Sequence, residues 1–466
     1  MKSKIRGGFL TYVLLFFGLV LTVFLVLGAI LILAPGTKIF GITYFKTNIH
    51  SNIKDVNVDG QNTLLSKIDI ENIIINIAPV TVGDKTFENA HYDISFVNNP
   101  DTVLFSFVVD DTIKGFTTYT ENTKSSASIN YDKTTKTITF LYKEPVASFY
   151  LGKKCSITIE TPKGYDSSNI NLFLNTIDGD ITLGNAETPI SLKSITANTK
   201  KGSTVINNNV TMTGGNISLK TESGNVLAYN LDNAYMKSTK PNIHLESLSG
   251  KINVGNLVGT VTVKSNRSTI NLGNIEGALT VDSEKGILYS GDITESFTVT
   301  ENSKYINMFL GEVHGEVLIA NSESSQVEIE KTYDRVEIRS KKGYIKIGEI
   351  TDEATLETES GNIEYYSTSY KEVNATTTKG KIIANLSTLS QPHTLKTTSG
   401  SIIINLNVNL NVTIKTKTAG DIRISWDPDF TGKTEFEAVR GNGIWKIYAE
   451  SEKGDITINE KEVSSI

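Results

Sequence analysis

Residues 354–402 read ATLETESGNIEYYSTSYKEVNATTTKGKIIANLSTLSQPHTLKTTSGSI, and this stretch contains the same short turn three times. Each turn has a glycine (Gly361, Gly380 or Gly400) that follows polar residues and precedes a run in which apolar and polar residues alternate. Alternation with a period of two, rich in Ile, Thr and Tyr, predicts half-buried β-strands. Glycine permits the positive φ that a tight corner requires. The stretch therefore predicts one strand before and one strand after each glycine corner.

The same turn recurs from about residue 175 to residue 456. Its glycines are Gly179, Gly202, Gly224, Gly250, Gly286, Gly343, Gly361, Gly380, Gly400, Gly420 and Gly454. Gly343 and Gly361 are 18 residues apart, and Gly380, Gly400 and Gly420 follow one another at intervals of 20. Repeats of this size predict an all-β solenoid in which each coil stacks on the one before and pairs with it in parallel. An antiparallel β-sandwich with hairpin turns is the alternative, but it predicts no fixed period.

Composition and pattern divide the chain into six segments. We expect a cytoplasmic stub at 1–8, a transmembrane helix at 9–33, a juxtamembrane linker at 34–63, irregular N-terminal β coils or a cap at 64–175, regular β-solenoid repeats at 176–425, and a C-terminal coil and cap at 426–466. A separate small β domain is the alternative for residues 64–151, which are rich in Phe and Tyr.

The first 33 residues have the pattern of a membrane anchor. Residues 9–33 carry no charge, and as a helix they would extend about 37 Å, which exceeds a hydrocarbon core of about 30 Å. Lys2, Lys4 and Arg6 precede the run, and no acid occurs before Asp55. The positive-inside rule then places the N-terminus in the cytoplasm and the β-rich part outside it. A cleaved signal peptide is the alternative, although its apolar region would be shorter.

The composition weakens several classes of function. The chain has 466 residues, a formal net charge of −6 and a single cysteine. An acidic chain has little means of binding nucleic acid by neutralising phosphates, and one cysteine excludes a disulfide framework. The five histidines are scattered, and no nucleophile elbow, Walker loop or dinucleotide fingerprint occurs. We therefore expect no cofactor, no metal site and no enzymatic activity.

Two features leave a functional alternative open. Trp426 and Trp445, the only tryptophans, lie near the C-terminus and predict either a cap that closes the core or an aromatic patch that stacks sugars. Several acids stand just before the turns. These acids are Glu222, Asp282, Glu301 and Glu359. They predict either a row of hydrated side chains on the outer surface or the catalytic acids of a polysaccharide lyase or glycosidase.

The repeated Ser-Gly-(Asn/Asp/Lys/Ser)-Ile turns, which end in the strand Asp455-Ile456-Thr457-Ile458, resemble the family named bacterial putative adhesin. The resemblance covers roughly residues 64–459 and implies a right-handed β-helical surface domain, with no catalytic residues to transfer. We therefore expect a single-pass, extracytoplasmic β-solenoid that serves as an adhesin-like binding or structural protein. Its expected partners are the membrane and an envelope polysaccharide or another surface protein. A carbohydrate-active enzyme and an envelope-stress signalling accessory are the alternative functions.

Overall fold

The computed structural model describes residues 5–33, 38–39, 42–78, 80–82, 85–87, 92–117, 126–143, 149–185, 188–231, 240–426 and 434–463. The chain divides into two compact units. The first unit comprises Met1–Tyr165 and Leu174–Asp180, and the second comprises Asp166–Phe173 and Ile181–Ile466.

The first unit begins with α1 (Ile5–Leu33), which has 29 residues. Many large apolar side chains on α1 are exposed, among them Leu15, Phe17 and Phe24. Among the residues that the structure describes, no helix meets the combined length and hydropathy expected of a membrane crossing. The transmembrane anchor therefore stays a prediction.

The strands of the first unit mix antiparallel and parallel pairs. They are β1 (Lys38–Ile39), β2 (Ile42–Ile53), β3 (Asp55–Val58), β4 (Gln61–Leu64), β5 (Asn72–Ala78), β6 (Val80–Val82), β7 (Lys85–Phe87), β8 (Asp93–Asn99), β9 (Ser106–Thr117), β10 (Ser126–Asp132), β11 (Thr137–Lys143) and β12 (Phe149–Pro162), with a short 3₁₀ helix at Leu65–Lys67. β9 lies between β2 and β12 and is antiparallel to both, whereas β12 pairs with β8, and β11 with β5, in parallel.

The linker predicted at 34–63 is wrong in part, because β2 runs through it and forms a long antiparallel ladder with β9. The alternating side chains of β2 account for this. Tyr44 and Phe45 are both buried, and from Lys46 to Ile53 exposed residues alternate with half-buried ones. The composition of this segment resembles that of a linker, and it gives no sign that β2 pairs with β9, some 60 residues later in the sequence.

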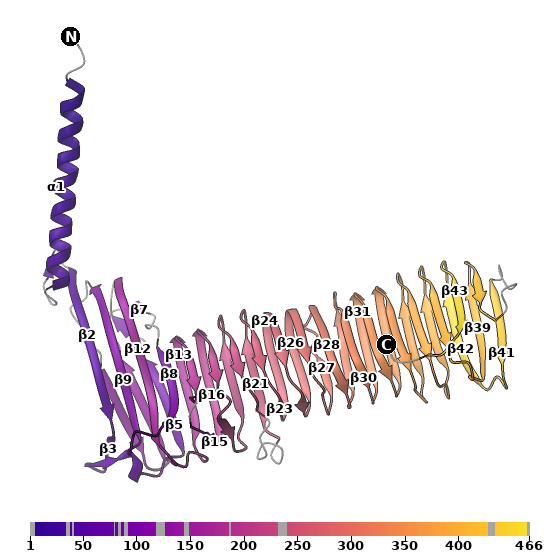
Figure 1. Cartoon of the computed structure of the whole chain (residues 1–466), viewed down its shortest axis with the longest axis horizontal. Coiled ribbons are helices and arrows are strands. Elements are labelled where there is room, and N and C mark those ends of the chain that lie inside the picture. Colours follow the sequence, from indigo (N-terminus) through magenta and orange to yellow (C-terminus); the bar gives the residue numbers. More distant parts are fainter. Residues whose placement is uncertain are drawn as a thin grey trace. The chain divides into compact units, whose positions relative to one another are not determined.

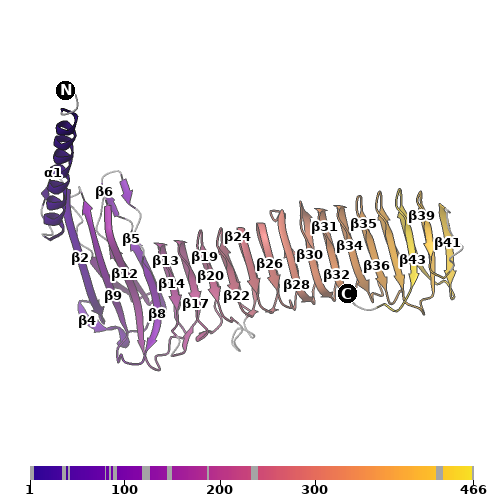
Figure 2. The same ribbon diagram turned by 45° about the horizontal axis from the view of Figure 1, so that its top comes forward.

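The second unit is a stack of coils whose strands form two long parallel ladders (Figures 1 and 2). We call them the pre-turn ladder and the post-turn ladder, by their place relative to the corner. The pre-turn ladder consists, in spatial order, of β16 (Ser194–Lys201), β19 (Ile217–Thr221), β21 (Asn242–Ser247), the first parts of β24 (Thr260–Leu272) and β26 (Leu279–Ser290), β27 (Phe297–Val299), β29 (Val317–Ser322), β31 (Val336–Lys342), β33 (Ala354–Ser360), β35 (Val373–Thr377), β37 (His393–Thr397), β42 (Trp445–Ser451) and β39 (Val412–Thr418).

The post-turn ladder follows the corner. It consists, in spatial order, of β14 (Ile181–Leu183), β17 (Thr204–Ile206), β20 (Val226–Ala228), β22 (Ile252–Val254), the last parts of β24 and β26, β28 (Tyr305–Val313), β30 (Val327–Thr332), β32 (Ile345–Ile350), β34 (Ile363–Ser367), β36 (Ile382–Leu386), β38 (Ile402–Leu406), β43 (Ile456–Glu460) and β40 (Ile422–Ile424). The remaining strands are β13 (Asn171–Asp178), β15 (Ile190–Leu192), β18 (Val210–Met212), β23 (Leu257–Val258), β25 (Ile275–Glu276) and β41 (Glu435–Arg440).

The core of the second unit lies inside the coils. In β33, Ala354 and Leu356 are buried while Thr355 between them is not, and the same alternation continues in β34 with Ile363 and Tyr365. Alternation matched to parallel pairing confirms the predicted all-β solenoid for this unit. The β-sandwich alternative is wrong here, because neighbouring strands within each ladder pair in parallel.

A hydroxyl group fixes several of the corners, and it belongs to Thr221, Ser247, Thr397 or Ser451. At one of them, Ser247 Oγ donates to the carbonyl oxygen of Gly224 at 2.8 Å and accepts from the N–H of Gly250 at 2.9 Å. A Cβ on Gly250 would overlap the Gly224 carbonyl, so close stacking of the chain requires glycine there. The corner thus joins each coil to the one before it.

The last coils are out of sequence order. β42 lies between β37 and β39, and β43 lies between β38 and β40. Gly454 therefore stacks between Gly400 and Gly420, which corrects the expectation that the regular interval of 20 residues places Gly420 directly on Gly400. Ser451 Oγ donates to the Gly400 carbonyl at 2.8 Å, and Thr418 Oγ1 donates to the Gly454 carbonyl. We call residues 445–460 the inserted coil.

A ladder of asparagine side chains runs into the inserted coil. Asn405 Nδ2 donates to Asn385 Oδ1 at 2.8 Å, and Asn459 Nδ2 donates to Asn405 Oδ1 at 3.0 Å. The corresponding residue of the end coil is Ser425. A partly buried amide needs a hydrogen-bonding partner, and Asn459 supplies one for Asn405. This explains why the inserted coil, rather than the end coil, stacks on β38.

Candidate functional site

The turn glycines predicted from the sequence lie at stacked corners. Gly224, Gly361, Gly380 and Gly400 each lie directly against the glycine carbonyl of the preceding coil, whereas Gly286 and Gly343 lie against Ser268 and Ser325. Gly202 and Gly179 have positive φ, and a Cβ on Gly179 would meet the Tyr92 carbonyl. Close backbone approach accounts for these glycines, so they position the coils.

The two tryptophans lie on the last coils. Trp426 follows β40, is 37% exposed, and has the Arg440 guanidinium 5.5 Å from its ring centroid. Trp445 begins β42 and pairs with Val412. Arg440 therefore covers part of the Trp426 ring and leaves less of it for a ligand. A sugar-stacking patch at the tryptophans stays a prediction.

The acids before the turns do not gather into one site. Asp282 accepts a hydrogen bond from Thr300 Oγ1 at 2.9 Å and lies opposite Lys264 on the neighbouring strand. Glu222 and Glu359 are exposed on coils far from it. Among the described residues, no group of three or more His, Cys, Asp or Glu side chains is placed to hold a metal ion.

Cys155 is buried in β12 of the first unit. Its Sγ lies 3.6 Å from Asp111 Oδ1, and the hydroxyl of Tyr142 donates to the same carboxylate. Asp111, Tyr142 and Cys155 are all enclosed in the core, where no substrate can reach them. This polar cluster belongs to the packing of the first unit.

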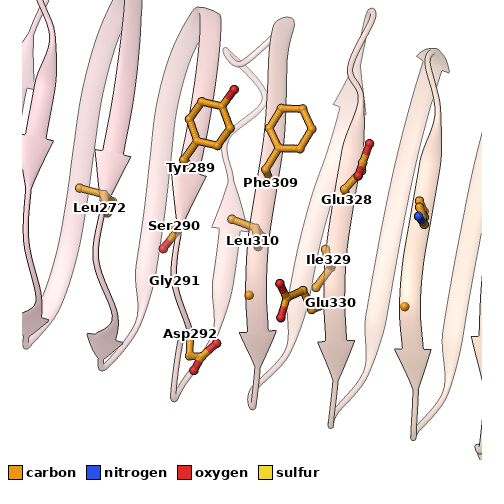
Figure 3. A pocket seen from close by; sticks show the side chains of 13 residues that line it. Leu272, Tyr289, Ser290, Gly291, Asp292, Phe309, Leu310, Glu328, Ile329 and Glu330 are labelled. Atoms are coloured by element: carbon orange, nitrogen blue, oxygen red, sulfur yellow. The ribbon is translucent and has the colours of Figure 1, made fainter. Parts of the chain in front are cut away.

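An aromatic pair marks the candidate site, on the outer face of the second unit. Tyr289 on β26 and Phe309 on β28 are register partners, with ring centroids 5.1 Å apart and planes 15° apart. Both point outward because Leu288 and Leu310, at inward positions, fill the core. Figure 3 shows the two rings side by side on neighbouring strands. Tyr289 is 45% exposed, so the pair offers an apolar surface to a ligand.

A row of glycines forms the floor beside the aromatic pair. Gly291 and Gly311 occupy one position of successive coils, and a Cβ on Gly291 would overlap the Oδ1 atom of Asn274. That oxygen accepts the backbone N–H of Asp292 at 3.0 Å, and Asp292 Oδ1 in turn accepts the N–H of Glu312 at 2.9 Å. The amide and carboxylate ladder thus requires glycine, and the outer surface is left without side chains there.

Charged residues complete a pocket of about 580 Å³ around the pair and the glycine floor. Glu328 is the register partner of Phe309, and Lys346 is the register partner of Glu328. Gln326 Nε2 donates to Glu328 Oε1 at 2.5 Å. Asp292 and Glu330 lie on the opposite side of the pocket from the two rings (Figure 3). The pocket therefore combines an aromatic surface with carboxylates and one lysine.

A second polar cluster lies at the next corner of the same coils. The rings of His314 and Tyr333 stack with centroids 4.4 Å apart, and Tyr333 donates to Glu312 Oε2 at 2.7 Å, which raises the pKa of Tyr333. Lys331 pairs with Glu349 at 3.1 Å, and this hydrogen bond raises the pKa of Lys331. These side chains use their hydrogen-bonding groups on one another, and the raised pKa values mean that Tyr333 and Lys331 release their protons less readily. We therefore assign them a structural role.

The pocket has the composition of a binding site. Ser290 lines the pocket, but its Oγ has no hydrogen-bond partner among the described residues, so no base activates it as a nucleophile. Those residues include no group of side chains placed to hold a metal ion. Aromatic rings beside hydrogen-bonding acceptors suit a ligand with apolar faces and hydroxyl groups. An extended sugar polymer has both.

Reasoning from the sequence missed this pocket, although two signals were present. The second corner has its own motif, Gly-(Asn/Asp/Glu)-(Leu/Ile/Val), at Gly255, Gly273, Gly291, Gly311 and Gly348. Tyr289 and Phe309 are 20 residues apart, which is one coil. Aligning the coils on both corners would have placed the two aromatics side by side.

Comparisons with known proteins identify the family. The family described as Toastrack DUF4097 matches residues 108–305 and 287–459. The chain belongs to this family. The match confirms the resemblance inferred from the repeated turns, and it begins within β9, so it covers the last strands of the first unit together with the solenoid.

One solved structure is also similar to this Toastrack chain. It is the crystal structure of a "putative cell adhesion protein" from Clostridium sporogenes, with 10% sequence identity over 89% of this chain and 100% of that chain, and with a TM-score of 0.15. No curated protein matches the chain.

Proposed function

We propose that this Toastrack protein is a membrane-anchored, extracytoplasmic β-solenoid that binds envelope polysaccharide in an adhesin-like manner. The anchor is argued from the sequence, in which the uncharged run 9–33 follows Lys2, Lys4 and Arg6. A right-handed winding is expected, since crossovers between parallel strands of one sheet are nearly always right-handed. Parallel ladders make the outer face stiff, which suits a surface that contacts a polymer.

The observation that carries the proposal is the pair Tyr289 and Phe309. Two nearly parallel rings on the outer face, beside a floor of glycines, leave room for a sugar ring to lie against them. Asp292 and Glu330 lie at the other side of the pocket, where they can accept hydrogen bonds from hydroxyl groups. Aromatic surface fixes the position of such a ligand and the carboxylates fix its orientation.

The test is binding of the full chain to a panel of purified envelope polysaccharides, compared with the variant Tyr289→Ala/Phe309→Ala. We expect the double variant to lose at least about tenfold in affinity, because removing two aromatic contacts costs a few kcal/mol. Tyr370→Ala is the matched control, since Tyr370 is an exposed tyrosine on another coil. Equal binding by the wild type and the double variant would refute the proposal.

A second candidate function is that of a carbohydrate-active enzyme, favoured by the acids Asp292, Glu328 and Glu330 and by Lys346 around one pocket. Against it, Asp292 already accepts a hydrogen bond from the N–H of Glu312 on the next coil, and Glu328 accepts one from Gln326, two residues earlier in the chain. We therefore favour binding. Release of shorter sugars from any polysaccharide in the panel would establish the enzyme.

A further inference from the structure

Two cations lie side by side at the corner before the aromatic pair. Arg267 on β24 and Lys285 on β26 are register partners, and Tyr305 on β28 is the next residue in the same row. Adjacent strands are about 4.8 Å apart, so the two charged side chains leave the backbone as close neighbours. All three residues are exposed. The row therefore presents two positive charges and a phenol hydroxyl to the solvent.

These two neighbouring cations lack the counter-charges that several other basic residues of the second unit have. Lys240 pairs with Glu295, Lys341 with Glu323 and Lys371 with Asp352, all within 2.9 Å. Among the described residues, neither Arg267 nor Lys285 forms an ion pair, even though Glu284 lies at the same corner. Like charges on neighbouring strands repel. Arg267 and Lys285 repel each other as neighbours, so a bound anion would stabilise this corner of an otherwise acidic chain.

The corner is also hollow. A depression of about 510 Å³ is lined by Arg267, Lys285 and Tyr305 together with Ser249 and Glu284. A second depression of about 440 Å³ shares Ser249, Arg267 and Lys285 and adds Lys251 as a third cation. Three cations therefore line two adjoining hollows.

The backbone under the cations is held firmly. The N–H groups of Asn266 and Arg267 both donate to the carbonyl of Leu248, at 3.2 and 3.1 Å. Ser268 Oγ donates to the carbonyl of Ser247 at 3.0 Å. The backbone that carries Arg267 is therefore fixed before a ligand binds. Binding then costs less conformational entropy of the protein than it would at a flexible loop.

We propose that this corner, formed by Lys251, Arg267, Lys285 and Tyr305, binds the phosphate groups of an anionic envelope polymer. The guanidinium of Arg267 matches two phosphate oxygens at once, the lysines add charge, and the tyrosine hydroxyl donates a further hydrogen bond. Lys285 precedes Tyr289 by four residues on β26, a separation of about 13 Å. One polymer chain can therefore reach both sites, but the phosphate site does not depend on the aromatic pocket.

The test measures binding of the full chain, in a neutral detergent, to linear inorganic polyphosphate at low ionic strength. The variant Arg267→Gln/Lys285→Gln removes two charges from the corner. We expect it to lose at least about tenfold in affinity, and we expect added salt to weaken wild-type binding. Lys379→Gln/Lys453→Gln is the control, because these exposed lysines precede the turn glycines of other coils and the net charge changes equally. It should bind as the wild type does.

Several results separate the phosphate site from the other proposals. Tyr289→Ala/Phe309→Ala should keep full affinity for polyphosphate, and loss of that affinity would overturn the assignment to the corner. No binding by the wild type, or equal binding by the Arg267→Gln/Lys285→Gln variant, would overturn the site itself. Polygalacturonate tests the chemical class, since tighter binding of this carboxylate polymer than of polyphosphate would overturn the choice of phosphate.

Discussion

The coils from β31 to β38 stack in the order of the sequence, whereas the last two coils do not. In the first region each strand pairs with the equivalent strand one turn later, as Ile363 pairs with Ile382 and Ile382 with Ile402. In the second region the chain passes from β38 to the end coil, continues into β41, and returns to place β42 and β43 between them. The pattern within a coil thus determines the ladder to which a strand belongs, but not the order of the coils.

The difference has a physical reason at the end of the stack. An open solenoid end exposes a row of unpaired N–H and C=O groups. Here β39 is covered by the antiparallel strand β41, from Val412 opposite Arg440 to Lys417 opposite Glu435. The inserted coil is paired on both sides. The last coil in the sequence therefore lies inside the stack, where it joins the end coil to the regular coils.

The largest expected effect comes from deleting residues 441–466, which removes the inserted coil. This deletion takes away Ile447, Ile456 and Ile458, each fully buried, at a cost of about 5–9 kcal/mol in total if each contributes ~1.5–3 kcal/mol. Because stability in repeat folds is mostly local, β31–β36 should keep their protection from amide hydrogen exchange while β39 and β40 lose it.

Deletion of residues 462–466 alone is the control for this experiment. It leaves β43 complete, so protection of β39 and β40 should match that of the whole chain. Full protection of β39 and β40 in the longer deletion would mean that the end coil does not depend on the inserted coil.

A smaller effect is expected at low pH from His393, which lies between Val373 on β35 and Ile447 on the inserted coil. Its side chain is fully buried, and neither ring nitrogen has a hydrogen-bond partner among the described residues. Burial lowers the pKa of His393 to about 4. In the unfolded chain the pKa returns to about 6.5, so the unfolded state binds more protons between these values.

The free energy of unfolding should therefore fall as the pH drops from about 7 towards 4, by up to about 3 kcal/mol from this residue. His393→Leu removes this contribution, and the difference in urea midpoint between the wild type and His393→Leu should grow on acidification. A difference that is the same at pH 4.5 and pH 7.5 would show that His393 is not held neutral between the coils.

Much of the solenoid follows from the sequence because its causes are local. The hydroxyl corner, the turn glycine and the alternation of Ile and Thr all lie within a few residues of one another, so the period of the turn reveals the coil. The first unit was harder to predict, because β9 takes antiparallel partners on both sides, and β2 precedes it by some 60 residues. Local alternation identifies strands but does not select such partners.

The order of the last coils depends on side chains that the period does not describe. Gly420 follows Gly400 at the regular interval, so spacing alone favours the wrong neighbour. The asparagine that continues the ladder from Asn405 is Asn459, and the end coil has Ser425 instead. A comparison of inward polar residues would have indicated the insertion.

The pocket beside Tyr289 and Phe309 was missed for a related reason. Tyr289 and Phe309 fall on outward positions, where the solenoid tolerates many residues, so neither the period nor the hydrophobic pattern distinguishes them. Their importance appears only when register places them together beside Gly291 and Gly311. The sequence therefore predicts the scaffold better than the surface that it presents.

The most direct test of the coil order is disulfide formation between engineered cysteines on the outer face. Ile403 pairs with Thr457, and Thr457 pairs with Arg423. Neighbouring strands are about 4.8 Å apart, within the range that a disulfide spans, whereas strands two places apart are separated by about 9.6 Å and lie beyond it. Cys155, the only native cysteine, is buried and does not compete.

Ile383→Cys/Ile403→Cys is the positive control, because these residues pair in the regular stack. In the full chain under mild oxidation, we predict that Ile403→Cys/Thr457→Cys forms a disulfide as readily as the control and that Ile403→Cys/Arg423→Cys does not. A disulfide in the second variant and none in the first would show that the coils stack in sequence order and would contradict the account.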